Sequence, residues 1–367
     1  MTGPSVAETG SLSKKSEGTR IAVLCKHNLS SLEPGDNIHT YDKIVALARQ
    51  ASVVLFTPFG YTSRSMKSQM EIVEVSPAGL RFRLALVLAL LSHRNDYDCI
   101  YTRDPMLMLF ATPMKIFGKP LILEMNGIPS REAELRRRTQ EVRAPGLTLF
   151  LCTMMRLIES FGIHCSDLVL PVTEKMRMTL VREYGAEARK VVMIPNSVDT
   201  TIFRPLENVR TEMRHKLGIR KETVVLYLST FSTRWREAWQ LFQVAMNIER
   251  KRNDIVFLVV GSGPLLEEMK ATKARVGSTS RAIFAGVVDH HLVPIYMNAA
   301  DVYVYDVTQV SSLEIDKQGL CPTKVLEAMA CGMPVILPKE PELQAMLRKS
   351  NGGFSASSLE EVEFFIE

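Results

Sequence analysis

Residues 319–337 read GLCPTKVLEAMACGMPVIL, a loop, a short helix and a buried strand in direct succession. The glycine and proline before the helix leave its first turn free to present backbone N–H groups to an anion. Lys324 adds a positive charge at that turn, and Glu327 lies on the same face of the helix. A carboxylate in this place can accept two hydrogen bonds from a ribose diol. The alternative is a surface ion pair between the two side chains.

The same alternation of strand and helix runs through the whole chain. Apolar runs typical of parallel strands buried on both faces fall at residues 21–25, 53–57, 98–101, 121–125, 168–172 and 191–194, and again at 224–228, 255–260, 282–284, 302–305 and 334–337. Helical spacing appears at 41–49, 235–250, 294–300 and 322–329. We predict an α/β protein with two doubly wound, Rossmann-like sheets: a flexible tail at 1–19, one domain at 20–200 and another at 201–367. Ligands of such sheets collect beyond the carboxyl ends of the strands, so the cleft between the domains is the expected site.

The composition is that of a globular protein without a strong electrostatic preference. Hydrophobic residues make up 46% of the 367 residues and charged residues 23%, with a formal net charge of +5. So mild a charge does not indicate a nucleic-acid partner; it suits an anionic substrate or an acidic membrane surface without requiring either. Six cysteines without CxxC spacing are expected to be reduced and mostly buried: Cys25, Cys99, Cys152, Cys165, Cys321 and Cys331.

Two apolar stretches, residues 84–91 and 147–155, have Arg and Lys nearby. The first is too short to span a bilayer. Core helices are the favoured interpretation of both, and a surface for a lipid-linked acceptor is the alternative. The chain is predicted to be cytoplasmic, with peripheral association at the inner face of a membrane as a compatible arrangement.

Several segments together resemble the family 4 (group 1) glycosyltransferases, a large retaining group with the GT-B fold. Residues 321–335 are similar to the branch that reads Ser-Pro-x-Lys-x-x-Glu-x-Met-Ala-x-Gly-x-Pro-Val, with Cys321 in place of Ser. The other similar segments are IPNSVD at 194–199, FRP at 203–205, LVVGSGP at 258–264, FAGVV at 284–288, VPIY at 293–296 and AADV at 299–302. The resemblance covers nearly everything from about residue 21 and is specific from residue 165 onward.

The resemblance implies a donor site in the C-terminal half. Glu327 should hold the ribose of the donor nucleotide, and Lys324 should lie at the sugar-diphosphate end. Arg236, with Arg234 as a second cation, takes the diphosphate-binding position, where positive charge offsets that of the leaving diphosphate; a solvated helix turn is the alternative for both arginines. The backbone around Val287 and Val288 would meet the base, unless both side chains are simply core. The implied donor-binding positions are Arg234, Arg236, Gly261, Val287, Lys324 and Glu327.

The sequence departs from the family pattern at positions that bear on activity. Retaining members commonly carry a second glutamate where this chain has Gly319. Glu237 replaces a glycine after the basic residue, Ser229 and Thr230 replace another after the first strand of the second half, and LPKEPE at 337–342 replaces a loop of small residues. These departures favour, as the alternative function, a non-catalytic GT-B protein that binds a nucleotide sugar or acts as a scaffold.

In the N-terminal half, the loop at 26–37 corresponds to the family's acceptor-side glycine loop, of which Gly35 remains. Glu124 and Asn126 end a strand where similar proteins carry Glu and Asn, so both are placed near the reacting sugar as catalytic candidates; a strand-end turn is the alternative. His39 on the acceptor side, and His27, are candidate polar contacts, with structural histidines as the alternative.

The function implied is retaining transfer of a hexose from a nucleotide-diphosphate sugar to a saccharide or lipid-linked acceptor, as in polysaccharide and glycoconjugate biosynthesis. No Asp-x-Asp element stands in a loop suited to a metal–diphosphate complex, so no metal and no cofactor beyond the nucleotide-sugar co-substrate are expected. An epimerase on this fold is less favoured, because the acids and histidines it needs around the sugar cannot be placed. The chain stops at Glu367, inside a helix predicted to begin near Leu359, so the final crossover helix of GT-B proteins is expected to be missing.

Overall fold

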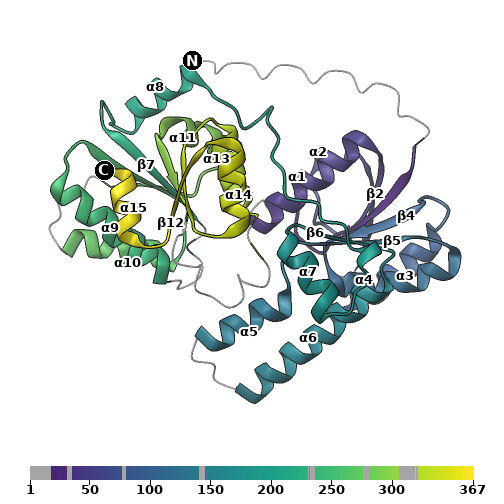
Figure 1. Ribbon diagram of the computed structural model, residues 1–367. Helices are drawn as coiled ribbons and strands as arrows, with labels where there is room; N and C mark the ends of the chain where they lie inside the picture. Colours follow the sequence, from purple (N-terminus) through teal and green to yellow (C-terminus); the bar gives the residue numbers. More distant parts are fainter. Residues whose placement is uncertain are drawn as a thin grey trace. The chain divides into compact units, whose positions relative to one another are not determined.

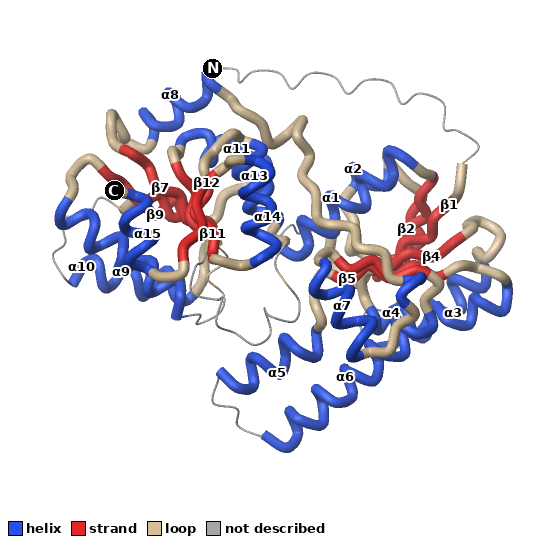
Figure 2. Tube along the Cα trace, viewed as in Figure 1, coloured by secondary structure: helices blue, strands red, loops and turns tan. Residues whose placement is uncertain are grey.

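The computed structural model describes residues 18–30, 35–76, 80–139, 145–229, 231, 236–275, 282–305, 319 and 321–367. Within them lie two parallel six-stranded sheets, one in each half of the sequence (Figures 1 and 2). The strand orders are β3-β2-β1-β4-β5-β6 and β12-β11-β10-β7-β8-β9, the same Rossmann-type order when the second is read from its other edge. The predicted α/β class with two Rossmann-like sheets is confirmed.

Contacts group the chain into two compact units, Met1–Glu124 with Leu157–Val169 and Met125–Arg156 with Leu170–Glu367. We call these the first and the second unit. The boundary between residues 200 and 201, and the tail at 1–19, remain predictions.

The N-terminal sheet contains β1 (Arg20–Leu24), β2 (Ser52–Pro58), β3 (Glu71–Val75), β4 (Cys99–Thr102), β5 (Leu121–Met125) and β6 (Leu168–Pro171). Helices α1 (Gly35–Gln50) and α2 (Arg64–Lys67) cover one face, and α3 (Leu80–Ser92) and α4 (Pro105–Ala111) cover the other (Figure 1). The strands are therefore apolar on both sides, as their uninterrupted sequence runs predict. The remaining helices of this half are η1 (Thr112–Phe117), α5 (Pro129–Thr139), α6 (Pro145–Cys165), α7 (Glu174–Glu183) and η2 (Ala188–Lys190).

The C-terminal sheet contains β7 (Thr223–Leu228), β8 (Ile255–Val260), β9 (Ile283–Gly286), β10 (Val302–Val304), β11 (Val335–Pro338) and β12 (Gly353–Ala356). Its helices are α8 (Glu207–Lys216), α9 (Arg236–Lys251), α10 (Pro264–Arg275), η3 (His290–Leu292), α11 (Val293–Ala299), α13 (Thr323–Ala330), α14 (Pro341–Ser350) and α15 (Leu359–Ile366). The helix predicted to begin near Leu359 is confirmed as α15.

Strand β7 shows how the C-terminal sheet forms a core on each face. Val225 and Tyr227 pack in a cluster with α9, α10 and α15, whereas Val224 and Leu226 pack in a cluster with α11, α13 and α14. Because side chains alternate along a strand, helices on both sides are needed to bury a run with no polar residue. This packing holds the start of α13 against the sheet.

One predicted strand is wrong. Residues 191–194 form only a single bridge at Val191, because the side chains of Val192, Met193 and Ile194 are each 39–46% exposed. They stay near the sheet through the Ile194 N–H, which donates to the Pro171 carbonyl at 2.9 Å. The prediction had no signal for β3 and β12, which lie at sheet edges and carry polar residues in EIVEV and GFSA.

The two apolar stretches are not simple core helices. In α3, Phe82, Leu86 and Leu90 are buried, but Leu84 and Leu88 face solvent. In α6, three further apolar side chains are about half exposed: Leu149, Phe150 and Leu151. Within the described ranges, no helix combines the length and apolarity required to cross a bilayer. None of the six cysteines, all of which the structure describes, forms a disulfide, and Cys25, Cys99, Cys152 and Cys331 are buried, as predicted.

Candidate functional site

Parallel strands β7, β8, β9 and β11 end on one side of the C-terminal sheet, which we call the carboxyl edge. Gly261 follows β8 there with φ +133°, and its N–H donates to the Gly286 carbonyl at 2.8 Å. A Cβ on Gly261 would lie 1.8 Å from the Ser229 carbonyl oxygen and 3.1 Å from the Phe231 ring. Only glycine fits, so the predicted donor residue Gly261 lies where the ends of β7 and β8 come closest.

Helix α13 begins at the same edge, because it precedes β11 and follows the strand β10. Lys324 lies in its first turn and is half-buried, and Glu327 follows one turn later, buried to 3% exposure. A buried glutamate does not match the alternative of a surface ion pair. A buried carboxylate that is to stay ionised needs donors around it.

The described partner of Glu327 is His290, whose Nε2 lies 3.8 Å from Glu327 Oε1. The His290 ring in turn lies beside Phe203, with the ring centroids 5.7 Å apart. Sequence reasoning missed His290, because a histidine pair in a loop carries no spacing signal. This separation is longer than a hydrogen bond, so the contact with His290 leaves the carboxylate able to accept hydrogen bonds.

The loop before α13 is tied to the segment at 194–199. Asn196 Nδ2 donates to the Cys321 carbonyl at 2.9 Å, and Asp199 accepts from the Thr201 N–H at 2.9 Å. The family-like segment therefore positions the start of α13. The sequence singled out Asn196 only as part of a linker motif, and this contact is its structural role.

Gly319, the position where a second glutamate is expected from the resemblance, has φ +65°. A Cβ there would lie 2.1 Å from Glu342 Oε2. Glu342 is in the first turn of α14, and Glu340 is the N-cap of this helix. Glu340 Oε2 accepts hydrogen bonds from the N–H groups of Glu342 at 2.8 Å and Leu343 at 3.0 Å. The side chain of Glu342 therefore fills the place that a side chain at 319 would take. Sequence reasoning missed both glutamates.

The other predicted donor residues are only partly described. Val287 follows β9 with its side chain 52% exposed, while Val288 packs against the sheet core. Arg236 is the first residue of α9, but its side chain and all of Arg234 lie outside the described part of the chain, as does the side chain of Glu237. Their contacts with a diphosphate remain predictions.

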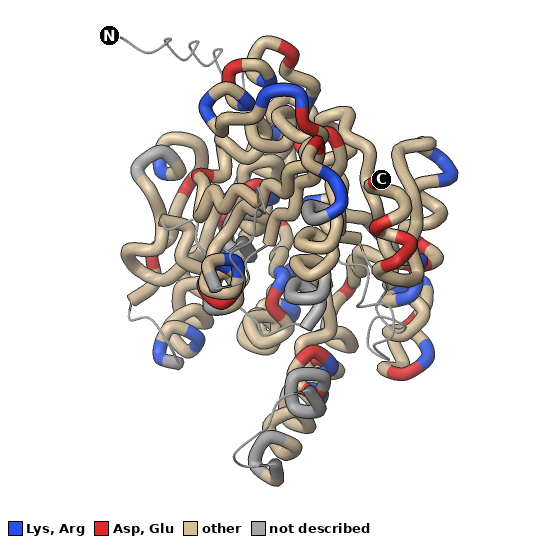
Figure 3. Tube along the Cα trace, turned by 90° about the vertical axis from the view of Figure 1, so that its left-hand side faces the viewer, with Lys and Arg blue, Asp and Glu red and all other residues tan. Residues whose placement is uncertain are grey.

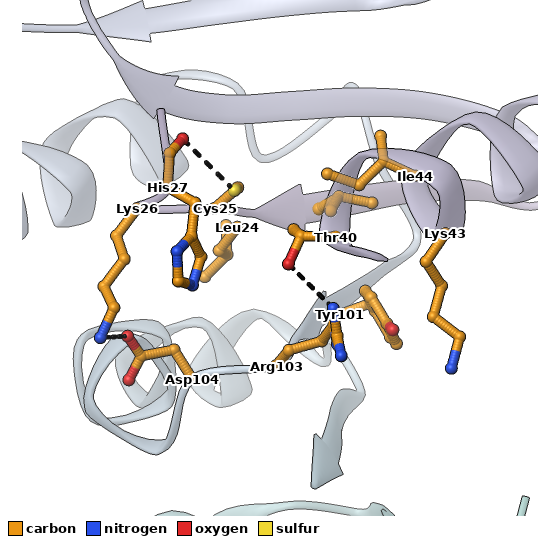
Figure 4. Close-up of a pocket in the computed structure, with 11 residues that line it drawn as sticks. Leu24, Cys25, Lys26, His27, Thr40, Lys43, Ile44, Tyr101, Arg103 and Asp104 are labelled. Atoms are coloured by element: carbon orange, nitrogen blue, oxygen red, sulfur yellow. Dashed lines mark hydrogen bonds and ion pairs between the residues drawn. The ribbon is translucent and has the colours of Figure 1, made fainter. Parts of the chain in front are cut away.

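The first unit contains an open pocket of about 330 Å³, a volume that includes solvent at its mouth (Figure 4). It lies at the ends of β1 and β4 and the start of α1. Its lining consists of Val23, Leu24, Cys25, Lys26, His27, Thr40, Lys43, Ile44, Tyr101, Arg103 and Asp104. Apolar side chains of β1 and α1 line it together with polar groups from α1 and from the segments that follow β1 and β4, a mixture typical of a small-molecule pocket.

Glu124 lies next to this pocket, held in a network of donors. Tyr101 Oη donates to its Oε2 at 2.6 Å, Lys43 Nζ to its Oε1 at 2.7 Å, and Arg103 Nε lies 3.2 Å from Oε1. Burial and the Glu124 charge raise the pKa of Tyr101, so it stays a protonated donor. The predicted catalytic glutamate is thus a buried anchor for two cations at the pocket, whereas Asn126 is exposed.

The remaining acceptor-side candidates lie on or near α1. Gly35 is its first residue, His39 is half-buried within it, and His27 lines the pocket. Burial raises the pKa of the Cys25 thiol to about 12, so this pocket cysteine is a protonated thiol rather than a nucleophile. Among the side chains that the structure describes, no cluster of three His, Cys, Asp or Glu could hold a metal ion.

Solved structures with the same fold define the class. The chain matches Anabaena HepE in complex with UDP and glucose with a TM-score of 0.70 at 18% identity, covering 95% of this chain and 89% of that one. It matches WaaG, a glycosyltransferase of lipopolysaccharide biosynthesis, with a TM-score of 0.64 at 15% identity, covering 94% and 89%. The chain therefore has the GT-B fold.

Family profiles name the particular family. The profile described as Glycosyltransferase Family 4 matches residues 35–202, and the profile described as Glycosyl transferases group 1 matches residues 222–365. Together they cover both halves of the chain. The chain belongs to the group 1, family 4 glycosyltransferases.

Curated relatives act on lipid or saccharide acceptors. A GDP-mannose-dependent alpha-(1-6)-phosphatidylinositol monomannoside mannosyltransferase of Mycolicibacterium smegmatis is 27% identical over 60% of this chain and 56% of its own. An alpha-monoglucosyldiacylglycerol synthase of Streptococcus pneumoniae is 31% identical over 56% and 44%. A chitobiosyldiphosphodolichol beta-mannosyltransferase of Debaryomyces hansenii is 20% identical over 74% and 59%. The chain spans about half the length of the curated relatives it matches.

Proposed function

We propose that this protein is a glycosyltransferase that moves a sugar from a nucleotide-diphosphate sugar, bound at the carboxyl edge, to an acceptor bound at the pocket of the first unit. The observation that carries the proposal is the buried carboxylate of Glu327, one turn after Lys324 on α13, at the carboxyl edge of the C-terminal sheet. The half of the chain that forms this sheet matches the glycosyltransferase group 1 profile. A ribose offers two adjacent hydroxyl donors to such a carboxylate. The α13 N-terminus and Lys324 offer N–H groups and charge to a diphosphate.

The chemistry follows from charge placement. As the glycosidic bond breaks, negative charge develops on the departing diphosphate, and positive groups fixed nearby lower that barrier. Lys324 is the described candidate, with Arg234 and Arg236 as further candidates. We propose that these cations make a metal unnecessary, and that the diphosphate helps to remove the acceptor proton. The names of relatives include both alpha and beta transferases, so retention is a proposal to be tested on the product.

For the acceptor we propose a lipid whose head group carries phosphate. Three cations line the pocket or its mouth, Lys26, Lys43 and Arg103, and relatives bear names with phosphatidylinositol, diphosphodolichol and diphosphoundecaprenol acceptors. Exposed apolar side chains of the first unit, Leu84 and Leu88 on α3 and Ile116 and Phe117 on the adjoining η1, fit peripheral contact with a membrane. We propose a cytoplasmic protein working at the inner face. Figure 3 shows Lys and Arg interspersed with Asp and Glu, which does not favour a nucleic-acid partner.

The first test is thermal-shift screening against UDP-, GDP-, ADP- and dTDP-sugars, because a bound donor raises the melting temperature by an amount that grows with its affinity. Glu327→Ala and Arg236→Ala are each expected to weaken donor binding by about 10- to 100-fold, the effect of losing a hydrogen bond to a charged group. Glu212→Gln, which changes an exposed glutamate of α8, is the control and should bind like the wild type. Melts without ligand verify that each variant folds.

The second arm measures transfer to phosphate-linked lipid in anionic vesicles, with and without EDTA, and the anomeric configuration of the product by NMR. Turnover that EDTA leaves unchanged supports the proposal. Donor binding without turnover on any acceptor would instead identify a non-catalytic nucleotide-sugar-binding protein. Full thermal shifts in both Glu327→Ala and Arg236→Ala would remove the proposed site.

A further inference from the structure

One carboxylate oxygen of Glu342 makes no hydrogen bond within the described part of the structure. Its Oε2 is fully buried and has no hydrogen-bond partner among the described residues. Its Oε1 is occupied, since it accepts from the Lys175 N–H at 3.0 Å. Buried polar atoms are rarely left unpaired, and each exception calls for an explanation such as a ligand.

Contacts with Lys175 and Glu340 fix the position of Glu342 Oε2. Glu340, 1% exposed, is held as the N-cap of α14 and by an ion pair with Lys175 Nζ at 3.2 Å. The Lys175 backbone N–H then fixes the other oxygen of Glu342. Oε2 is thereby directed at Gly319, where a Cβ would come within 2.1 Å. A side chain at 319 and this carboxylate exclude each other, so glycine at 319 leaves this space to the Glu342 carboxylate.

Glu342 and Gly319 lie at the carboxyl edge of the C-terminal sheet, the edge at which we propose that the sugar donor binds. Helix α14, with Glu342, begins just after β11 ends; helix α13, with Lys324 and Glu327, runs back to the start of β11, so it begins on the same side of the sheet, and Gly319 shortly precedes it. The carboxylate therefore lies at the carboxyl edge, between the starts of the two helices. Glu327 is one acidic group there, and Glu342 is a second, with a buried oxygen that has no hydrogen-bond partner among the described residues.

We propose that Glu342 accepts a hydrogen bond from a hydroxyl of the transferred sugar and so sets the preference for the donor sugar. This inference rests on the proposed function, because it assigns a part of the nucleotide-sugar site. A sugar ring carries donors that the nucleoside diphosphate lacks, and epimers direct one hydroxyl differently. A site that binds a particular hydroxyl discriminates strongly against sugars without it, because its buried acceptor would stay unpaired.

The electrostatics agree with an incompletely satisfied group. Burial, with the nearby charge of Glu340 next among the unfavourable causes, raises the pKa of the Glu342 carboxyl, although the backbone N–H groups of Lys175 and Glu174 and the Lys175 charge oppose the rise. A sugar hydroxyl would add a donor to this carboxylate.

The test compares two ligands in one protein. Nucleoside diphosphate and nucleotide sugars that differ at single hydroxyls are titrated by calorimetry into wild type, Glu342→Gln and Gly319→Ala. The glutamine keeps an oxygen for the Lys175 N–H but offers N–H₂ where Oε2 was. Gly319→Ala leaves Glu342 in the chain, but the added Cβ takes the position that Glu342 Oε2 occupies. We expect both variants to bind nucleoside diphosphate like the wild type and to lose about tenfold in affinity for the preferred sugar, with its advantage over one epimer removed.

Glu212→Gln serves as the matched control and should keep both affinities. A purely structural role for Glu342 predicts equal losses for nucleoside diphosphate and nucleotide sugar, and that result would overturn the proposal. So would unchanged sugar preference in both Glu342→Gln and Gly319→Ala. A wild type that binds no nucleoside diphosphate would instead refute the proposed function itself.

Discussion

Two glutamates at the carboxyl edge differ in how the protein satisfies them. Glu327 is buried with His290 beside it. Glu342 accepts a hydrogen bond from the Lys175 N–H through Oε1, while its Oε2 has no partner among the described residues. Spacing within the motif at 319–337 predicted that Glu327 shares one face of α13 with Lys324. Nothing in the motif predicted Glu342, because its neighbour Gly319 precedes it by a whole helix and strand. A pairing between such distant residues exists only after folding.

The free energy of unfolding should depend on pH through the Glu342 carboxyl. The folded pKa of Glu342 is raised, so the folded state holds this proton more tightly than the unfolded state. Its contribution to stability is therefore present below the unfolded pKa, near 4.5, and is lost as pH rises through the raised value. In melts from pH 4 to pH 8, the melting temperature of Glu342→Gln should rise relative to wild type as pH increases. A difference that does not change with pH would contradict this assignment.

At the scale of elements, the C-terminal sheet is held at both ends of its strands: α8 is attached where β7 and β10 begin, and Gly261 lies where β7 and β8 end, at the carboxyl edge. Polar helix α8 has no buried residue, and Arg210 and Arg214 attach it to Asp301, which also accepts from the Val224 N–H at 2.7 Å. The ends of β7 and β8 meet across Gly261. The Gly261 turn could be predicted from LVVGSGP, whereas the α8 contacts could not, because charged residues at helical spacing usually face solvent.

Gly261→Ala should destabilise the protein strongly. The added Cβ meets the Ser229 backbone at 1.8 Å and the positive φ is unfavourable, so we expect a loss of unfolding free energy of about 3 kcal/mol or more. Gly218→Ala is the control: its φ of +69° is also positive, but no atom lies within 4 Å of its Cβ. Its loss should be about 1 kcal/mol. Urea unfolding measures both, and equal losses would show that the close approach of β7 and β8 is unimportant.

At the scale of the whole molecule, the same Rossmann-type sheet occurs twice and carries different chemistry. The carboxyl edge of the second sheet presents Lys324 and Glu327, and the pocket of the first unit presents cations anchored by Glu124. Each group of residues is assembled within one unit. The two proposed binding steps should therefore respond to different substitutions.

Glu124→Gln should affect the acceptor and not the donor. The amide keeps the hydrogen bond from Tyr101 but removes the charge that holds Lys43 and Arg103, both of which are partly exposed. We expect stability to fall by about 1–3 kcal/mol, and KM for the acceptor to rise several-fold with unchanged affinity for nucleoside diphosphate. Steady-state kinetics and calorimetry on the folded variant measure these values. A matching loss of nucleotide affinity would show that Glu124 belongs to the donor site.

Local patterning alone determined the fold class and the position of Lys324 and Glu327 on one helix. Buried parallel strands must be apolar on both faces, and α13 must follow a Gly- and Pro-containing loop, so both were visible in the sequence. Edge strands β3 and β12, the exposed segment at 191–194 and the His290 contact were not, because their character depends on neighbours supplied by remote segments. Only the tertiary structure decided that Glu342 occupies the space beside Gly319 and that Glu124 is a buried anchor. Burial and hydrogen-bond partners are properties of the packed chain, and no spacing rule encodes them.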